Sequence, residues 1–249
     1  MLVTLAERPD LASATYSIPY SPDSPKFMTG SLTSLLVRGR RVVRRWPHLV
    51  VALLEADIPV ARGIMVPFRS RASLPARGWD EVAVWAAEDA LDDVAPDTAC
   101  ALEIAVHPDH QGRGHSRVVL EGMRAAAAGL TSLVIPVRPP DKAAVPATPM
   151  REYAAQTRAD GLPADRWLRT HVRAGGRIEG VAPCSATVQA SLADWRRWTG
   201  LPFDRDGAVV VPGALAPVFV STVEDFAVYV EPNVWVSHRV GGFQGYPFV

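Results

Sequence analysis

The chain has 249 residues, of which 48% are hydrophobic and 21% charged, as expected for one large or two small globular domains with a full core. Its 26 Lys and Arg residues equal its 26 Asp and Glu residues, so no net charge favours binding to nucleic acid or to an anionic membrane. The two distant cysteines fit a reducing cytosol better than a disulfide framework, and the charges inside the longest apolar stretch, 49–66, argue against a membrane span. We therefore expect a cytoplasmic protein, and the Arg- and Ala-rich composition suggests a bacterial one.

The N-terminal third predicts an arm followed by a helix and a hairpin. Residues 1–27 are rich in Pro, Ser and Tyr and have no steady period, which indicates an extended arm or lid. Apolar residues with helical spacing predict a helix over 31–46. The next elements are strands at 49–55 and 60–68, joined by a turn, and a helix at 80–91.

The middle of the chain predicts a strand–loop–helix–strand unit. A strand at 101–106 leads through the loop 107–112 into a helix at 114–128, and a second strand follows at 133–137. Beyond a Pro-rich stretch at 139–165 we expect a helix at 163–174, a strand at 177–189, a short helix at 191–198 and two strands within 208–240.

Helices and mixed hairpins alternate along the chain, which predicts an α/β fold with a central mixed β-sheet flanked by helices. We expect one domain over 28–240, the arm at 1–27 and a C-terminal tail at 241–249.

The start of the helix after the strand 101–106 has the features of an anion site. A helix start carries unpaired N–H groups and a partial positive charge, and a diphosphate can accept several of those bonds. Gly112 and Gly114 let the backbone approach such a group closely, and Arg113 can add a charge-assisted contact. Rival interpretations are a plain tight turn, a nucleotide P-loop, which lacks its Lys, and a metal site at His107, His110 and His115, which lacks a recognised ligand pattern.

The segment 102–120 resembles the acetyl-CoA motif of the GNAT (GCN5-related N-acetyltransferase) superfamily. Val106, Pro108, Gln111 and Gly114 match that motif, while His115 replaces an aliphatic residue and Ser116 a small one. The resemblance implies a GNAT-like fold that binds acetyl-CoA or another acyl-CoA as co-substrate, without a metal. Ile104 and Val106 would bond the pantetheine arm, and the segment from Gln111 through Gly112, Arg113, Gly114 and His115 to Ser116 would hold the diphosphate.

The same resemblance implies a role for His171. Many GNAT proteins carry a Tyr four residues before a Gly in the helix after the fifth strand, and that Tyr protonates the departing CoA thiolate. His171 stands four residues before Gly175, and an imidazole can transfer protons near neutral pH. The alternative is an ordinary packed histidine. GNAT-like decarboxylases of polyketide loading modules also carry a His here, but their partner Thr has no counterpart in the strand 133–137.

A general base is needed before an amine can attack a thioester, and Glu103 on the motif strand is the candidate, with Glu55 and Glu231 as weaker ones. We therefore expect an N-acyltransferase that transfers acetyl to a small-molecule amine. The alternatives are decarboxylation of malonyl- or methylmalonyl-CoA, acyl transfer to a carrier protein, and a non-catalytic acyl-CoA-binding module. A homodimer is a further candidate assembly.

Overall fold

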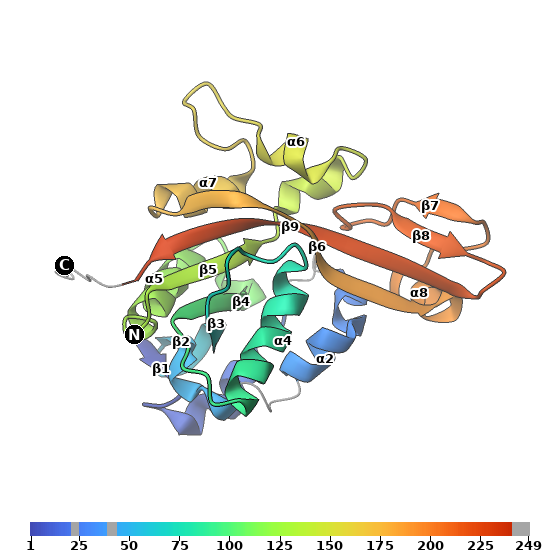
Figure 1. Cartoon of the computed structure of the whole chain (residues 1–249). Helices are drawn as coiled ribbons and strands as arrows, with labels where there is room; N and C mark the ends of the chain where they lie inside the picture. The colour runs from blue at the N-terminus through green and yellow to red at the C-terminus, as the bar shows by residue number, and fades with distance from the viewer. Residues whose placement is uncertain (21–24, 39–43, 241–249) are drawn as a thin grey trace.

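The computed structural model describes residues 1–20, 25–38 and 44–240 and builds them around one nine-stranded sheet (Figure 1). The strand order is β1-β2-β3-β4-β5-β9-β8-β7, and β6 pairs with β9 off this path. Only β4 and β5 run parallel, so the sheet is mixed, as predicted. The strands are β1 (Leu2–Thr4), β2 (Val50–Glu55), β3 (Ile58–Phe68), β4 (Thr98–Val106), β5 (Ser132–Val137), β6 (Arg177–Ser191), β7 (Gly207–Val209), β8 (Val218–Ser221) and β9 (Phe226–Arg239).

Helices cover both faces of the sheet. The α-helices are α1 (Ala12–Tyr16), α2 (Leu32–Arg38), α4 (Gly78–Leu91), α5 (His115–Ala126), α6 (Met150–Ala154), α7 (Arg166–Arg173) and α8 (Leu192–Thr199). Short 3-10 turns are η1 (Pro9–Leu11), η2 (Lys26–Gly30), η3 (Pro47–Leu49), η4 (Pro108–His110) and η5 (Pro140–Ala144). The helix predicted over 31–46 is observed as α2 in its first half, and 39–43 lie outside the described residues.

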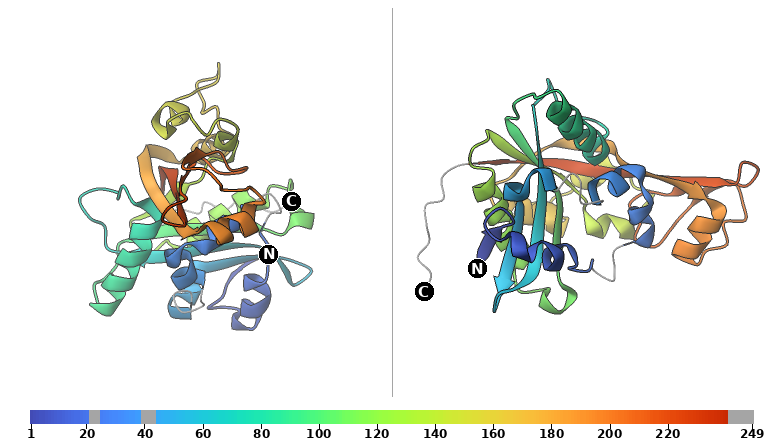
Figure 2. Two further views of the ribbon diagram at one scale, coloured as in Figure 1. Left: turned by 90° about the vertical axis from the view of Figure 1, so that its right-hand side faces the viewer. Right: turned by 90° about the horizontal axis from the view of Figure 1, so that it is seen from below.

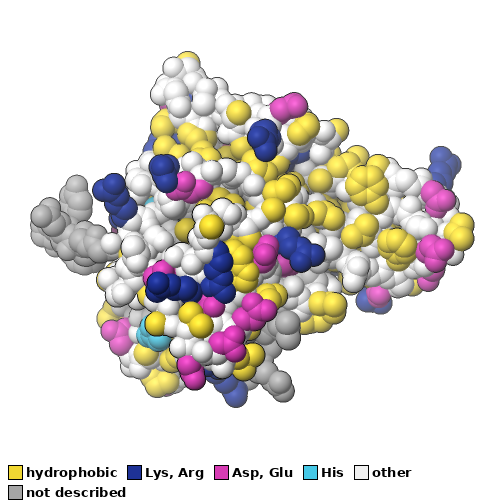
Figure 3. Space-filling model, viewed as in Figure 1, with side chains coloured by type: hydrophobic (Ala, Val, Ile, Leu, Met, Phe, Trp, Pro, Cys, Tyr) yellow, Lys and Arg dark blue, Asp and Glu magenta, His cyan; other side chains and the backbone are white. Residues whose placement is uncertain are grey.

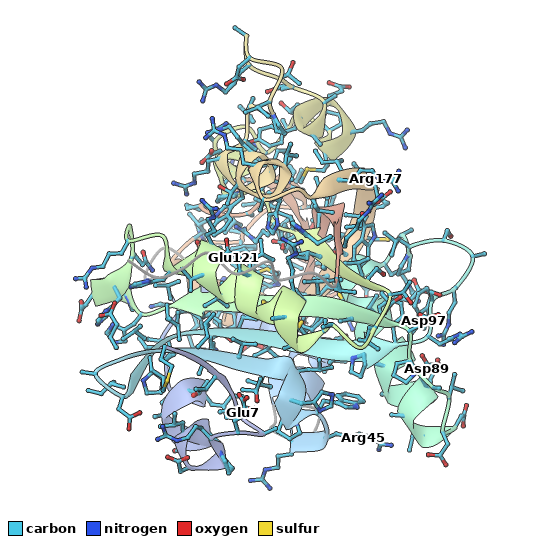
Figure 4. The ribbon with its side chains drawn as sticks, turned by 90° about the vertical axis from the view of Figure 1, so that its left-hand side faces the viewer. Glu7, Arg45, Asp89, Asp97, Glu121 and Arg177 are labelled. Carbon is cyan, nitrogen blue, oxygen red and sulfur yellow. The ribbon has the colours of Figure 1, made fainter. Side chains whose placement is uncertain are left out.

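The main core lies between the sheet and α5, which crosses in front of the strands in Figure 4, where Glu121 of this helix is labelled. Val119 and Met123 of α5 pack onto β3 at Gly63, whose missing side chain leaves the helix room to approach. A Cβ at that glycine would lie 2.5 Å from the Met123 sulfur. Burial of apolar surface contributes about 25 cal/mol per Å² to the free energy of folding, and this contact fixes the position of α5 along the strands.

A second core lies beyond the edge of the first, because β9 is long enough to serve both. One edge of β9 pairs with β6, and the other pairs with β8 near its start and with β5 near its end. The starting half carries Tyr229, which packs with Phe27 and, in the same cluster, Trp195 of α8. Figures 1 and 2 show this part extending away from β1–β5 along β9.

The described parts of the predicted arm 1–27, residues 1–20 and 25–27, pack into the domain rather than lying outside it. β1 adds to the sheet by pairing with β2, and Phe27 is 1% exposed in the second core. Neither feature was evident from a segment without periodicity, because a three-residue strand and a single anchoring Phe leave no repeating pattern. The predicted tail 241–249 lies outside the described residues.

The surface mixes both signs of charge. Figure 3 shows Lys and Arg next to Asp and Glu over the face that it displays, in keeping with a net charge of zero. Within the described residues, no helix is long and apolar enough to cross a membrane.

Candidate functional site

The parallel strands β4 and β5 separate soon after they begin. They pair only at Thr98 with Ser132, Ala99 with Leu133 and Cys100 with Val134. Further along, β4 continues to Val106 with β3 on its other edge, and β5 continues to Val137 with β9 on its other edge. The facing edges beyond Cys100 and Val134 therefore have no pairing to each other, and an extended ligand with amide groups can bond there as an added strand.

A bulge marks the place where the strands part. Ile64 and Met65 of β3 pair with Glu103 and Ala101, which leaves Leu102 as an extra residue of β4. The carbonyl of Leu102 accepts a hydrogen bond of 3.0 Å from the indole of Trp79 at the start of α4. Such bulges redirect side chains and end strand pairing. Ile104 and Val106, the predicted pantetheine contacts, lie beyond the bulge and pair with Gly63 and Ala61.

The loop after β4 ends in an uncapped helix start. Gly112 and Gly114 have φ values of 75° and 79°, which non-glycine residues rarely adopt, and Gly114 is the N-cap of α5. A Cβ built on either glycine would meet nothing within 4 Å, so internal packing does not require them. No acceptor among the described residues bonds the amides from Gly112 to Ser116, the second residue of α5. These amides point to an anion site.

The side chains of this loop bond to the protein rather than to one another. Gln111 donates to the carbonyl of Val106 at 3.3 Å, which closes the loop on the end of β4. Arg113 donates to the carbonyl of Asp109 at 3.2 Å and stays 55% exposed, free to turn toward a bound anion. His115 lies 2.9 Å from a carboxylate oxygen of Glu55, at the end of β2. The sequence named Glu55 only as a weak base candidate and gave no sign of this contact.

Glu103, the predicted general base, has both carboxylate oxygens engaged. Oε1 lies 2.5 Å from Nε of Arg62, and Oε2 accepts from the Tyr20 hydroxyl at 2.5 Å. Arg62 is 3% exposed and also donates to the carbonyls of residues 15, 16 and 18. Glu103 thus belongs to a buried network that holds the N-terminal segment against β3 and β4. It directly follows the bulge residue Leu102 on β4.

His171, the predicted acid, is buried in the last turn of α7. The helix is capped by Asp165, whose Oδ1 accepts from the amides of Trp167 and Leu168. His171 is 4% exposed, and its Nδ1 lies 3.0 Å from Nε2 of His238 on β9. Burial, and secondly the charge of His238, lower the pKa of His171 to about 4. At neutral pH the ring is therefore neutral.

A further carboxylate, which the sequence indicated only as the start of a helix, adjoins along the chain the Trp79 whose indole bonds the bulge. Asp80 follows Trp79 in the first turn of α4, and its Oδ2 accepts from the Thr187 amide of β6 at 2.9 Å. Burial raises the pKa of Asp80, while the Thr187 amide and the nearby Thr33 act in the opposite direction. Its Oδ1 makes no hydrogen bond of normal geometry to a described residue. A desolvated carboxylate of this kind is suited to accept a proton.

Comparison with known proteins gives one close sequence relative. The chain is 30% identical to an arginine N-acetyltransferase of Aspergillus versicolor over 279 aligned positions, which cover 96% of this chain and 93% of the relative. No protein-family model matches the chain. The relative is fungal, so a bacterial source for this chain remains a prediction.

Two solved structures share the architecture over nearly the whole chain. The loading GNATL domain of CurA from Lyngbya majuscula aligns with a TM-score of 0.59 and 18% identity, covering 96% of both chains. The GNAT-like decarboxylase GphF, solved with isobutyryl-CoA, aligns with a TM-score of 0.55 and 17% identity, covering 96% of this chain and 97% of its own. At such identities the likeness shows the fold.

Proposed function

Because the chain belongs to the GNAT superfamily and is an acyltransferase, we propose that it transfers acetyl from acetyl-CoA to the nitrogen of a small-molecule amine. The observation that carries the proposal is the separation of β4 and β5 beside an uncapped helix start. The unpaired strand edges suit the amide groups of pantetheine, and the free amides from Gly112 to Ser116 suit its diphosphate.

The reaction needs a deprotonated amine and a stabilised leaving group. The amine nitrogen attacks the thioester carbon, a C–N bond forms, the C–S bond breaks, and the CoA sulfur leaves as a thiolate that takes up a proton. Holding both reactants at the vertex of the separated strands supplies much of the rate, because it replaces a chance encounter by a fixed geometry.

Two carboxylates are proposed for the proton of the amine. Glu103 lies on the motif strand, but a base must release its contacts to Arg62 and Tyr20 before it accepts a proton. Asp80 has a raised pKa, and its neighbour Trp79 bonds the bulge of β4. We propose His171 as a neutral hydrogen-bonding group near the leaving sulfur, in partnership with His238.

Arginine is the first acceptor to test, because the A. versicolor relative acts on it. The purified full chain is incubated with acetyl-CoA and a panel of amines headed by arginine, and free thiol and acetylated product are measured. We expect release of CoA that depends on the amine. Malonyl-CoA in a parallel sample tests the alternative: loss of CO2 without an amine would favour a decarboxylase, and binding of CoA without turnover would favour a binding module.

The diphosphate site has a test of its own. The paired substitutions Gly112→Ala and Gly114→Ala introduce methyl groups where no protein atom lies within 4 Å, so they leave the core unchanged. They obstruct a ligand at the helix start, and at φ values of 75° and 79° they also strain the backbone that presents the amides. We expect CoA to bind at least about 10-fold more weakly by calorimetry, a loss of about 1.4 kcal/mol. Gly161→Ala is the matched control, since Gly161 also has a φ of 75° and open space around a built Cβ but lies far along the chain from the proposed site. Equal CoA affinity in all three proteins would contradict the proposed site.

A further inference from the structure

Three side chains with metal-binding atoms meet beside the start of α5. Glu55 is the last residue of β2, His110 ends η4, and His115 is the first residue of α5. Nδ1 of His110 lies 3.0 Å from one carboxylate oxygen of Glu55, and Nε2 of His115 lies 2.9 Å from the other. All three ligand atoms lie within 4.8 Å of one another. The chain folds two distant segments together to form this group.

These close contacts are not hydrogen bonds. The two ring nitrogens are buried, yet neither has a hydrogen-bond partner of normal geometry, since the carboxylate oxygens lie off the directions in which ring N–H groups would donate. A buried polar atom without a partner costs about 1–3 kcal/mol, so the arrangement is unfavourable unless something else occupies the ring lone pairs.

The donor set matches one class of ligand. Two neutral imidazole nitrogens and one carboxylate are the ligands that zinc takes in three-ligand sites, with bonds of about 2.0–2.2 Å. Tetrahedral bonds of that length separate neighbouring ligand atoms by about 3.3 Å. Here each ring nitrogen lies 2.9 or 3.0 Å from a different carboxylate oxygen of Glu55, and the three ligand atoms lie within 4.8 Å of one another, so small side-chain rotations bring them to that spacing. The side chains are 39%, 26% and 13% exposed for Glu55, His110 and His115, so an ion can enter from solvent.

Two neighbouring side chains bear on the binding of a cation: Arg113, whose positive charge opposes it, and His107, which lies outside the cluster. Arg113 places a guanidinium nitrogen 3.8 Å from Glu55, but its side chain is 55% exposed and can move into solvent when a cation binds. His107, which the sequence grouped with His110 and His115, does not join the cluster; its Nδ1 accepts from the Asp109 amide at 3.3 Å. Glu55 is the third member of the cluster instead, and the spacing of residues along the chain could not indicate this.

We propose that Glu55, His110 and His115 bind one divalent transition-metal ion, with zinc as the best fit and water in the fourth position. The ion ties the β2–β3 hairpin to the loop that leads into α5 and fixes the backbone around Gly112. This site departs from the metal-free protein expected from the sequence. It does not depend on the proposed acyl transfer, because its ligands and its test involve no CoA.

The test titrates zinc alone into the full chain after chelator treatment and dialysis. We expect one zinc per chain by calorimetry and, with cobalt in its place, the visible absorption of a four-coordinate ion. His110→Ala and His115→Ala should each weaken zinc binding by about 100-fold, and Glu55→Gln by about 10-fold. His107→Ala is the matched control and should keep the affinity within about twofold of the original.

The unfolding temperatures of the zinc-free variants separate loss of the site from loss of the fold. A variant that melts with the original protein but no longer binds zinc supports the proposal, as does a zinc-induced rise in melting temperature that only the original and His107→Ala proteins show. Absence of stoichiometric binding to the original protein overturns it. So does binding that survives all three ligand substitutions, or that His107→Ala abolishes.

Discussion

At the scale of single residues, the contact between His171 and His238 makes stability depend on pH. Burial is the main cause that lowers the pKa of both rings from 6.5 to about 4. The unfolded chain, with ordinary histidines, therefore binds more protons than the folded one between pH 4 and 6.5. The contribution of these two rings to the free energy of unfolding should be constant above this window and fall by roughly 3 kcal/mol for each ring as the pH drops through it.

Urea unfolding at a series of pH values measures this dependence. His171→Gln and His238→Gln should each flatten the curve between pH 4 and 6.5, because each removes one of the two groups that must protonate on unfolding. His48→Gln, at an exposed position in η3, should leave the slope unchanged. A slope in the His171→Gln protein equal to that of the original would show that the pair does not titrate as described.

Single residues also show where sequence patterns stop being informative. Gly112 and Gly114 could be assigned to a helix start from their spacing, and the structure places them there with positive φ. The contacts of Glu103 with Arg62 and of Glu55 with His115 could not be predicted, since each joins positions more than forty residues apart. Those contacts are set by sheet register and loop closure, which no local period encodes.

At the scale of elements, Arg62 links two strands to the N-terminal segment. Its guanidinium reaches Glu103 and three carbonyl groups between residues 15 and 18 while remaining almost wholly buried. Arg62→Leu removes the buried donor that these acceptors share, and Glu103 keeps only its hydrogen bond from Tyr20. We therefore expect a loss of about 3–5 kcal/mol in the free energy of unfolding and faster amide exchange over residues 12–20.

Arg117→Leu provides the comparison for that change. Arg117 is 72% exposed on α5 and pairs only with Glu121, so its loss should cost less than about 0.5 kcal/mol. Exchange over residues 12–20 that is equally slow in the original and Arg62→Leu proteins would mean that other contacts hold this segment.

The helices and strands were predicted best where the element is long enough to show several repeats of its apolar pattern. The helix at 114–128 and the strand at 133–137 are observed as α5 and β5 with ends shifted by one to two residues. Short pieces such as β1, α6 and β7 were not predicted, because three to five residues hold less than two turns or two repeats. The range 208–240, predicted to hold two strands, contains β8 and the whole of β9, whose length shows only once its partners β5, β6 and β8 are known.

At the scale of the whole molecule, β9 runs through both cores, so we expect the two cores to unfold as one cooperative unit. Trp195 is fully buried in the second core, and truncation to Ala should cost about 3–5 kcal/mol. Because β9 and β6 are paired along both cores, we expect this loss to speed amide exchange in β5 as well as in β8. Val210→Ala, at a position 59% exposed, should change neither.

If amide exchange in the Trp195→Ala protein rises only over residues 192–221, while β2 to β5 keep their protection, the second core unfolds independently of the first. The sequence predicted the mixed sheet and its flanking helices but not this joint architecture. Predicted strand ranges do not say which strand continues past the edge of its neighbours.

The last pair between β4 and β5, Cys100 with Val134, closes the inner end of the gap between the two strands. On the binding mode proposed above, an extended ligand between the two strand edges can reach no further than this last pair, so the pair sets the position of the ligand's reactive end. One additional pair would withdraw that end by about 3.3 Å, the rise of a single strand residue. On the binding mode proposed above, misplacement of about 1 Å can slow the reaction about 100-fold, so we expect turnover to depend on the number of residue pairs between β4 and β5.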